Sequence, residues 1–137
     1  MIKTPLTKLM VVDDDSDTLL VIKYCLEEIP SVTVKYASSG EEALQVLQGF
    51  IPDLILLDVM MPAMDGFETF KAIRKLPSLK KTPIVFFTAK VQKKDIEKQL
   101  AFGAFDVIVK PFDSLPDQIL SIWEKYTALG KSTQKSV

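Results

Sequence analysis

The chain has 137 residues, 47% of them hydrophobic, and its 18 acidic and 17 basic side chains leave a formal net charge of −1. This length predicts a single domain with a substantial core, and the balanced charge favours neither nucleic acid nor an anionic membrane as a partner. The absence of histidine excludes imidazole catalysis, histidine phosphotransfer by this chain and most zinc sites, while a single cysteine excludes an internal disulfide framework.

Strand-like and helix-like patterns alternate along the chain. The apolar run 8–12 predicts a first strand, followed by a helix that Ser16 is expected to cap and Pro30 to end. The β-branched segment 33–36 predicts a second strand, and a second helix opens at Gly40 with acidic residues in its first turn, where the helix dipole favours them. The first half of the chain therefore reads as two strand–helix units.

The second half continues the alternation. A continuous apolar run at 54–57 predicts a third strand covered on both faces, and a helix rich in phenylalanine follows it. A fourth strand is predicted at 84–87, and Ile96 and Leu100 mark a fourth helix up to Gly103. A fifth strand is predicted at 107–109, and the buried stripe of a last helix is traced by Leu115, Ile119, Ile122 and Tyr126.

Five strands alternating with five helices predict an α/β fold, a doubly wound parallel sheet with helices on both faces. A strand order of 2-1-3-4-5 would place the first and third strands side by side, and ligands of such sheets bind beyond the carboxyl ends of the strands. The small, polar residues from Gly130 onward predict a disordered tail. We therefore expect one domain at 1–129 and a tail at 130–137.

Chemically active side chains stand at four predicted strand ends. They are Asp13 and Asp14 after KLMVV, Asp58 after LILL, Thr88 after IVFF and Lys110 after VIV. A carboxylate pair can hold a hard divalent cation, and a third carboxylate beside it can be both a ligand and a nucleophile. A hydroxyl and an ammonium can hold phosphoryl oxygens. The pattern predicts one site for Mg²⁺ and a phosphoryl group.

Plainer roles for the same residues stay open at this point. The acidic run 13–17 also suits a solvated loop that caps a helix, and Asp58 suits a turn before Pro62. Thr88 suits a helix N-cap, and Lys110 suits a solvated surface lysine.

Four segments, VVDDDSD, PDLILLDVMMPAMDG, FFTAK and VKPF, occur in this order. They resemble the signature segments of the receiver domain of two-component response regulators, and the chain is similar to the single-domain chemotaxis regulators of that family. The resemblance runs from about Lys8 to Tyr126, nearly the whole predicted domain. It implies a flavodoxin-like receiver fold with the strand order given above.

The resemblance also implies a role for each residue of the site. Asp58 would be the phosphoacceptor, and Thr88 and Lys110 would contact the phosphoryl group. The Mg²⁺ ligands would be Asp13, Asp14, Asp58 and the backbone carbonyl of Met60. The peptide bond between Lys110 and Pro111 would be cis.

The implied function is that of a phosphoacceptor in a two-component system or phosphorelay. A phosphohistidine on a sensor histidine kinase or a histidine phosphotransfer protein would donate the phosphoryl group, and slow self-dephosphorylation would be the only enzymatic activity. A downstream protein would read the surface built from the fourth helix, the fifth strand and the fifth helix. No helix-turn-helix follows Tyr126, so no direct contact with nucleic acid is expected, and a homodimer stays open.

Location follows from what the sequence lacks. No stretch approaches the roughly 18 consecutive apolar residues of a spanning helix, and the first residues, MIKTPLTKLMVV, lack the long apolar stretch of a signal peptide. We therefore expect a cytoplasmic protein without a membrane partner. The single Cys25 falls in an apolar helical pattern, which fits a core position in a reducing compartment.

The sequence departs from the family pattern at three positions. Val107 stands where the family carries a tyrosine or phenylalanine that changes rotamer on phosphorylation, with Phe105 two residues earlier. Met60 and Lys90 are bulky residues at the expected mouth of the site. We expect signal transmission to depend on the Thr88 loop and loss of the phosphoryl group to be slow.

The alternative is a haloacid-dehalogenase-like Mg²⁺-dependent phosphatase, which also uses an aspartate at a strand end. Such enzymes generally carry a second acid two residues after the nucleophile, where this chain has Met60, and no cap domain is visible. A degenerate receiver that only binds partners would lack a site residue, and none is missing.

Overall fold

The structure is a computed structural model that describes residues 4–89 and 92–135. Five parallel strands form one sheet in the order β2-β1-β3-β4-β5. The strands are β1 (Lys8–Val12), β2 (Thr33–Ala37), β3 (Leu54–Asp58), β4 (Ile84–Thr88) and β5 (Asp106–Val109). The predicted strand order is confirmed.

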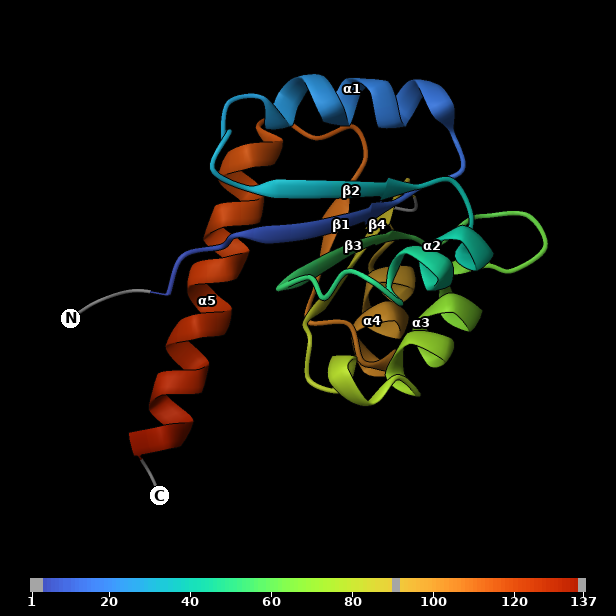
Figure 1. Ribbon diagram of the computed structural model, residues 1–137. Helices are drawn as coiled ribbons and strands as arrows, with labels where there is room; N and C mark the ends of the chain where they lie inside the picture. Colours follow the sequence, from blue (N-terminus) through green and yellow to red (C-terminus); the bar gives the residue numbers. More distant parts are fainter. Residues whose placement is uncertain (1–3, 90–91, 136–137) are drawn as a thin grey trace.

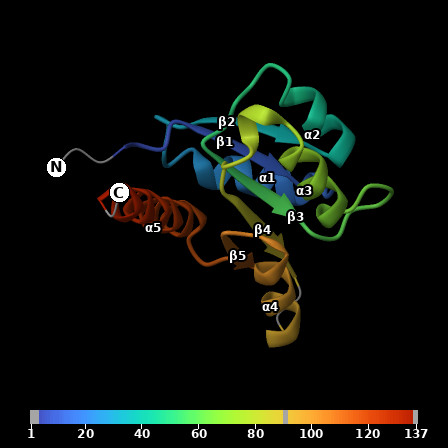
Figure 2. The ribbon, with the colours of Figure 1, turned by 90° about the horizontal axis from the view of Figure 1, so that it is seen from below.

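Helices cover both faces of the sheet, as the doubly wound prediction requires. Figure 1 shows α1 and α5 on one face and α2, α3 and α4 on the other, and Figure 2 shows α4 standing out beside β5. The helices are α1 (Ser16–Leu26), α2 (Gly40–Val46), α3 (Gly66–Arg74), α4 (Lys93–Phe102) and α5 (Leu115–Lys135), with one short 3₁₀ turn at Pro77–Leu79.

Alternate residues of the central strands face two separate cores. Leu9 and Val11 of β1 pack toward α1 and α5, whereas Met10 and Val12 pack toward α2 and α3. The third strand divides in the same way between the two clusters. Because each face is covered, both sets of side chains leave water, and each buried large apolar residue contributes about 1.5–3 kcal/mol. This explains why β3 reads as a continuous apolar run.

Some element ends differ from the sequence prediction. Asp15, rather than Ser16, caps α1, because its carboxylate accepts the backbone N–H of Asp17. The helix also ends at Leu26, where i→i−3 hydrogen bonds tighten the last turn before Pro30. Cys25 is half-buried and packs against the core on the α1 and α5 side.

The last helix continues beyond the predicted domain boundary. We expected a disordered tail from residue 130, but α5 runs through Gly130 to Lys135. A single helical glycine costs only about 1 kcal/mol relative to alanine, and no proline follows it to break the helix. Residues 136–137 of the expected tail lie outside the described residues. Figure 1 shows the end of α5 projecting past the sheet.

None of the helices in the described parts of the chain is long and apolar enough to cross a membrane.

Candidate functional site

The carboxyl ends of four parallel strands bring the predicted site residues together. Asp13 follows β1, Asp58 is the last residue of β3, Thr88 is the last residue of β4, and Lys110 follows β5. The Lys110 Nζ lies 2.7 Å from the Asp13 Oδ2 and 3.3 Å from the Asp58 Oδ1. One ammonium therefore links two carboxylates that are 45 residues apart in the chain.

The site is buried on its inner side and open on its outer side. Asp13 and Thr88 have no solvent-exposed surface and Asp58 is 4% exposed, whereas Asp14 is exposed. The second oxygen of the Asp13 carboxylate accepts the backbone N–H of Asp15 at 2.9 Å. Buried carboxylates are costly unless they are paired, so these contacts fix the orientation of Asp13.

The electrostatics single out Asp58. Burial of its carboxyl and the nearby charge of Asp13 raise its pKa from 3.8 to about 7, against the opposing effect of Lys110. For Lys110, burial by itself favours the neutral amine, but the hydrogen bond to Asp13 and the charge of Asp58 outweigh it and raise the pKa. The lysine stays charged, and Asp58 is the group whose ionisation is unfavourable.

Three carboxylates are placed to share one cation. One oxygen from each of Asp13, Asp14 and Asp58 lies within 4.8 Å of the others. All-oxygen ligands suit Mg²⁺, which also keeps several waters, and the exposed Asp14 side leaves room for them. A bound cation would offset the burial of the Asp58 carboxyl and its repulsion by Asp13, which together raise the pKa of Asp58. The residues therefore fit the ion that the sequence predicted.

The loop after Asp58 has a tightly specified shape. The Gly66 N–H donates to the Val59 carbonyl oxygen at 2.9 Å, and a Cβ at position 66 would collide with the backbone of Asp58 and Val59. Ala63 adopts a left-handed φ of 62°. The Met60 side chain is 59% exposed at the rim of the site, and its backbone N–H donates to the Asp58 carboxylate. The role of the Met60 carbonyl as a metal ligand stays a prediction.

The ends of β4 and β5 are joined beside the site. The Lys110 N–H donates to the Thr88 carbonyl oxygen at 2.7 Å, and the predicted cis bond between Lys110 and Pro111 is confirmed. Sequence reasoning missed Phe87, whose ring lies 4.6 Å from the Lys110 Nζ and 5.4 Å from the ring of Phe112. Strand alternation, which places residue 87 on the α5 face, was the available signal. Lys90 and the rest of the predicted Thr88 loop to Val91 lie outside the described residues.

The position of the expected aromatic switch holds a small residue. Val107 is half-buried and packs on the α3 side of the sheet. Phe105 packs on the opposite side, where its ring meets Tyr126 edge-on at 5.5 Å. Phe105 therefore does not occupy the place of the missing aromatic residue.

A pH prediction follows from the raised pKa of Asp58. Between about pH 4 and pH 7 the folded, metal-free protein keeps a proton on Asp58 that the unfolded chain has released, so stability should fall as the pH rises through this window. Asp58→Asn removes the cost of ionisation and should stabilise the metal-free protein at pH 8 by roughly 1–3 kcal/mol. At pH 4 the two proteins should differ little. Urea unfolding in a chelator at both pH values measures this, and a variant no more stable than the parent at pH 8 contradicts it.

Comparisons with known proteins agree with this geometry. The family model for the response regulator receiver domain matches residues 9–122. The structure of the chemotaxis protein CheY4 of Vibrio cholerae is similar with a TM-score of 0.77 and 32% identity, covering 86% of this chain and 99% of that one.

Two curated relatives differ in length. An uncharacterized 14.6 kDa protein in the sodA1 3′ region of Leptolyngbya boryana is 35% identical over 118 residues, which cover 86% of this chain and 88% of that protein. The alkaline phosphatase synthesis transcriptional regulatory protein PhoP of Bacillus subtilis is 41% identical over 105 residues, which cover 77% of this chain and 42% of PhoP. The matched family model, the sheet order and the relatives agree: the chain belongs to the response regulator receiver domain family of two-component signalling.

Proposed function

We propose that Asp58 accepts a phosphoryl group from a phosphohistidine of a sensor histidine kinase or a histidine phosphotransfer protein, in a site that holds Mg²⁺. The observation that carries this proposal is the Asp58 carboxylate at the end of β3, 3.3 Å from the Lys110 ammonium and within reach of a shared cation with Asp13 and Asp14. These 137 residues contain no histidine, so the donor phosphohistidine lies outside them.

The proposed transfer forms one bond and breaks one. A carboxylate oxygen of Asp58 attacks phosphorus, an acyl phosphate forms, and the bond from phosphorus to the donor imidazole nitrogen breaks, so that the imidazole leaves and takes up a proton. Lys110 remains charged and pairs with the phosphoryl oxygens after transfer. The bound Mg²⁺ would supply positive charge toward the same oxygens. Water later hydrolyses the acyl phosphate to the Asp58 carboxylate and inorganic phosphate.

The surface next to the site supports a protein as donor. Leu20, Val21 and Tyr24 of α1 are 67%, 51% and 75% exposed, and Val21 lines a mainly apolar hollow that reaches Lys110. A protein that presents a phosphohistidine to Asp58 has to cover this rim. Exposed apolar side chains in a contiguous group are typical of protein contact surfaces.

A second surface supports a protein as effector. Between α4 and α5, beside β5, a hollow is lined by Leu100 and Leu129, which are 43% and 57% exposed. We propose that phosphorylation shifts the population of conformations of this α4–β5–α5 surface and that a downstream protein reads it. A second copy of the chain on the same surface would give a homodimer. The cytoplasmic location and the absence of direct nucleic-acid contact also stay proposals.

Intact-mass measurement after incubation with acetyl phosphate and Mg²⁺ tests the proposal against its alternatives. A phosphoacceptor gains one phosphate that decays slowly. A haloacid-dehalogenase-like phosphatase instead turns over many phosphoester molecules, and a binding module gains no mass. The matched family model, the similar structure and the relatives named above give no support to that phosphatase alternative.

We expect the Thr88 hydroxyl to couple phosphorylation to the α4–β5–α5 surface, because Val107 supplies no ring to move. A hydrogen bond from a hydroxyl to a charged phosphoryl oxygen contributes about 1.5–3 kcal/mol, enough for a tenfold or larger population shift. Thr88→Ala should leave Asp58 phosphorylated but remove most of the phosphorylation-dependent change in amide hydrogen exchange over α4, β5 and α5. Thr88→Ser, the matched control, should keep that change. A full response in Thr88→Ala contradicts this route.

A further inference from the structure

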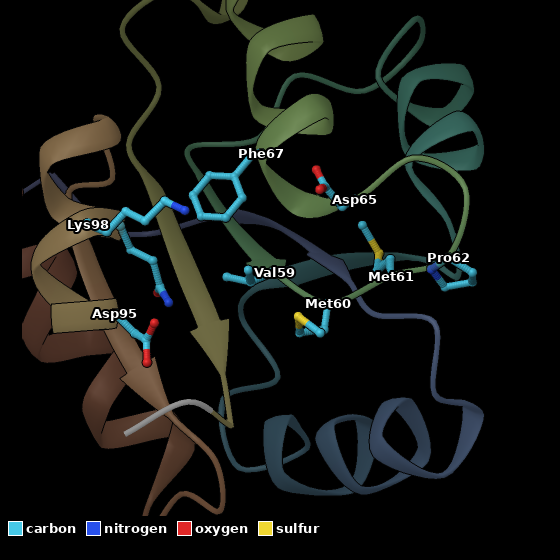
Figure 3. A pocket seen from close by; sticks show the side chains of 9 residues that line it. Val59, Met60, Met61, Pro62, Asp65, Phe67, Asp95 and Lys98 are labelled. Atoms are coloured by element: carbon cyan, nitrogen blue, oxygen red, sulfur yellow. The ribbon is translucent and has the colours of Figure 1, made fainter. Parts of the chain in front are cut away.

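A cavity of about 470 Å³ lies next to the loop that follows Asp58, and Lys110 is not among its lining residues. Its apolar wall is the loop segment 59–62 and the ring of Phe67, and its polar wall comes from the start of α3 and from α4 (Figure 3). This volume lies within the range of small-molecule sites, which are mostly apolar with a few polar groups that converge. None of the side chains that line this cavity takes part in the proposed phosphoryl transfer. Of the lining residues, only Met60 has a role there, through its backbone.

Gln99 of α4 is the first sign that this cavity is a binding site. The residue lines the cavity and is only 2% exposed. Its side-chain carbonyl oxygen is shielded from solvent and has no hydrogen-bond partner among residues 4–89 and 92–135. Buried side-chain oxygens are nearly always paired, because an unpaired one loses its bond to water without a replacement. Gln99 therefore keeps an unused acceptor in the wall of the cavity, which a donor in the cavity would satisfy if the side chain turned toward it.

The charged groups around the cavity favour a ligand that is a positively charged hydrogen-bond donor. Asp65 and Asp95 lie on opposite sides of it in Figure 3, with Lys98 beside Phe67. The Asp65 Oδ1 caps α3, and the Asp95 carboxylate makes no hydrogen bond or ion pair with the described residues. The Lys98 ammonium already lies 5.4 Å from the centre of the Phe67 ring. The lining thus carries one more negative than positive charge, an unpaired carbonyl oxygen and an aromatic face that accepts cations.

We propose that this cavity binds a guanidinium group on an apolar stem. A guanidinium presents five N–H donors in a plane, carries a weakly held hydration shell and stacks on aromatic rings, so it matches acceptors set around an apolar wall. Its N–H groups would pair with the Asp95 carboxylate and, once the Gln99 side chain turns its shielded carbonyl oxygen toward the cavity, with that oxygen. Its stem would lie against Met60 and Met61. The source is either a free small molecule or an arginine side chain of a partner protein. This proposal does not depend on phosphorylation of Asp58.

To test this, the full chain is titrated in a buffer that contains Mg²⁺. The two titrants are butylguanidine and butylurea, which has the same shape but is neutral. Amide NMR shifts report both affinity and place. We expect saturable one-to-one binding of butylguanidine, with shifts centred on 59–67 and 95–99, and butylurea binding at least about tenfold more weakly. Asp95→Asn and Gln99→Leu should each weaken butylguanidine about tenfold. Glu97→Gln, an exposed acid of the same helix that pairs with Lys93, is the matched control and should bind as the parent does.

A second titration, with a tripeptide, distinguishes a free small molecule from an arginine side chain of a partner protein as the source of the guanidinium. Acetyl-Ala-Arg-Ala amide that binds at the cavity, while its citrulline counterpart does not, assigns the site to a partner's arginine; binding of butylguanidine alone assigns it to a small molecule. Gln99→Leu should unfold at the parent's temperature or above, since it removes the unpaired oxygen, and this shows that any lost affinity is not lost folding. Equal binding of butylurea, shifts centred on residues 13–14, or no saturable binding of either guanidinium probe overturns the proposal.

Discussion

An Asp58→Asn variant should gain no phosphate mass from acetyl phosphate and Mg²⁺ under conditions in which the parent gains one phosphate. The asparagine amide has the size of the carboxylate but is a far weaker nucleophile, so we expect the rate of phosphorylation to fall by more than about 100-fold. The fold should survive, because burial and the charge of Asp13 already disfavour the ionised Asp58. Intact-mass spectrometry under native conditions measures the result.

Asp15→Asn is the matched control for this experiment. Asp15 is exposed, stands two residues from Asp13, and uses its carboxylate to cap α1 and to accept the Thr18 hydroxyl. Asparagine caps helices as well as aspartate does, so the variant should fold and become phosphorylated like the parent. If Asp58→Asn still gains one phosphate while Asp15→Asn behaves as the parent, the acceptor is another residue and the proposed function is wrong in its central assignment.

Periodicity in the sequence predicted the alternating strands and helices and the sheet edge at which the site residues lie, whereas the strand order was implied by the resemblance to receiver domains. An apolar run that ends in Asp58 is a buried strand that carries a carboxylate to its carboxyl end. In a parallel sheet all such ends lie on one edge, so Asp13, Thr88 and Lys110 were expected on the same edge as Asp58. The strand order 2-1-3-4-5 then made β1 and β3 neighbours, which brought Asp13 and Asp58 together.

The exact ends of the helices were harder to predict, because neighbouring residues of similar propensity compete to form them. Asp15 and Ser16 are both good N-caps, and only the backbone geometry decides which side chain reaches the free N–H groups. The end of α5 depends on whether polar residues after Gly130 continue a helix, and nothing in their pattern forbids it.

Gln99 shows a different limit of sequence reasoning. The expected apolar positions of α4 were Ile96 and Leu100, yet Leu100 is 43% exposed and Gln99 is buried. The helix stands beside β5 rather than flat on the sheet (Figure 2), and its inward contact comes from Phe102, which packs against Phe67 and Phe70. Side-chain packing decides how a helix is oriented on a sheet. The periodic pattern of the sequence therefore did not predict that Gln99 would face inward.

Mg²⁺ affinity should depend strongly on Asp14. Asp14→Asn should weaken Mg²⁺ binding at least about tenfold, because it removes one of the carboxylates that a single cation can share and leaves the remaining two intact. Asp14 gives a cleaner test than Asp13, since Asp13 also pairs with Lys110 and accepts the Asp15 N–H. Asp15→Asn, again the matched control, should change Mg²⁺ affinity by less than about twofold, because the Asp15 carboxylate is engaged with Thr18 and Asp17.

The pH dependence of Mg²⁺ binding gives the same experiment an independent check. A metal ligand must lose its proton before it binds, and the pKa of Asp58 is raised to about 7. Mg²⁺ affinity measured by calorimetry should therefore fall as the pH drops below 7, and it should fall much less in Asp58→Asn, which has no proton to displace. The Asp14 dependence and this pH dependence both require one ion shared by Asp14 and Asp58. A loss of affinity in Asp15→Asn that exceeds the loss in Asp14→Asn would place the ion on the outer acidic loop, away from Asp58, and would remove the metal from the proposed transfer.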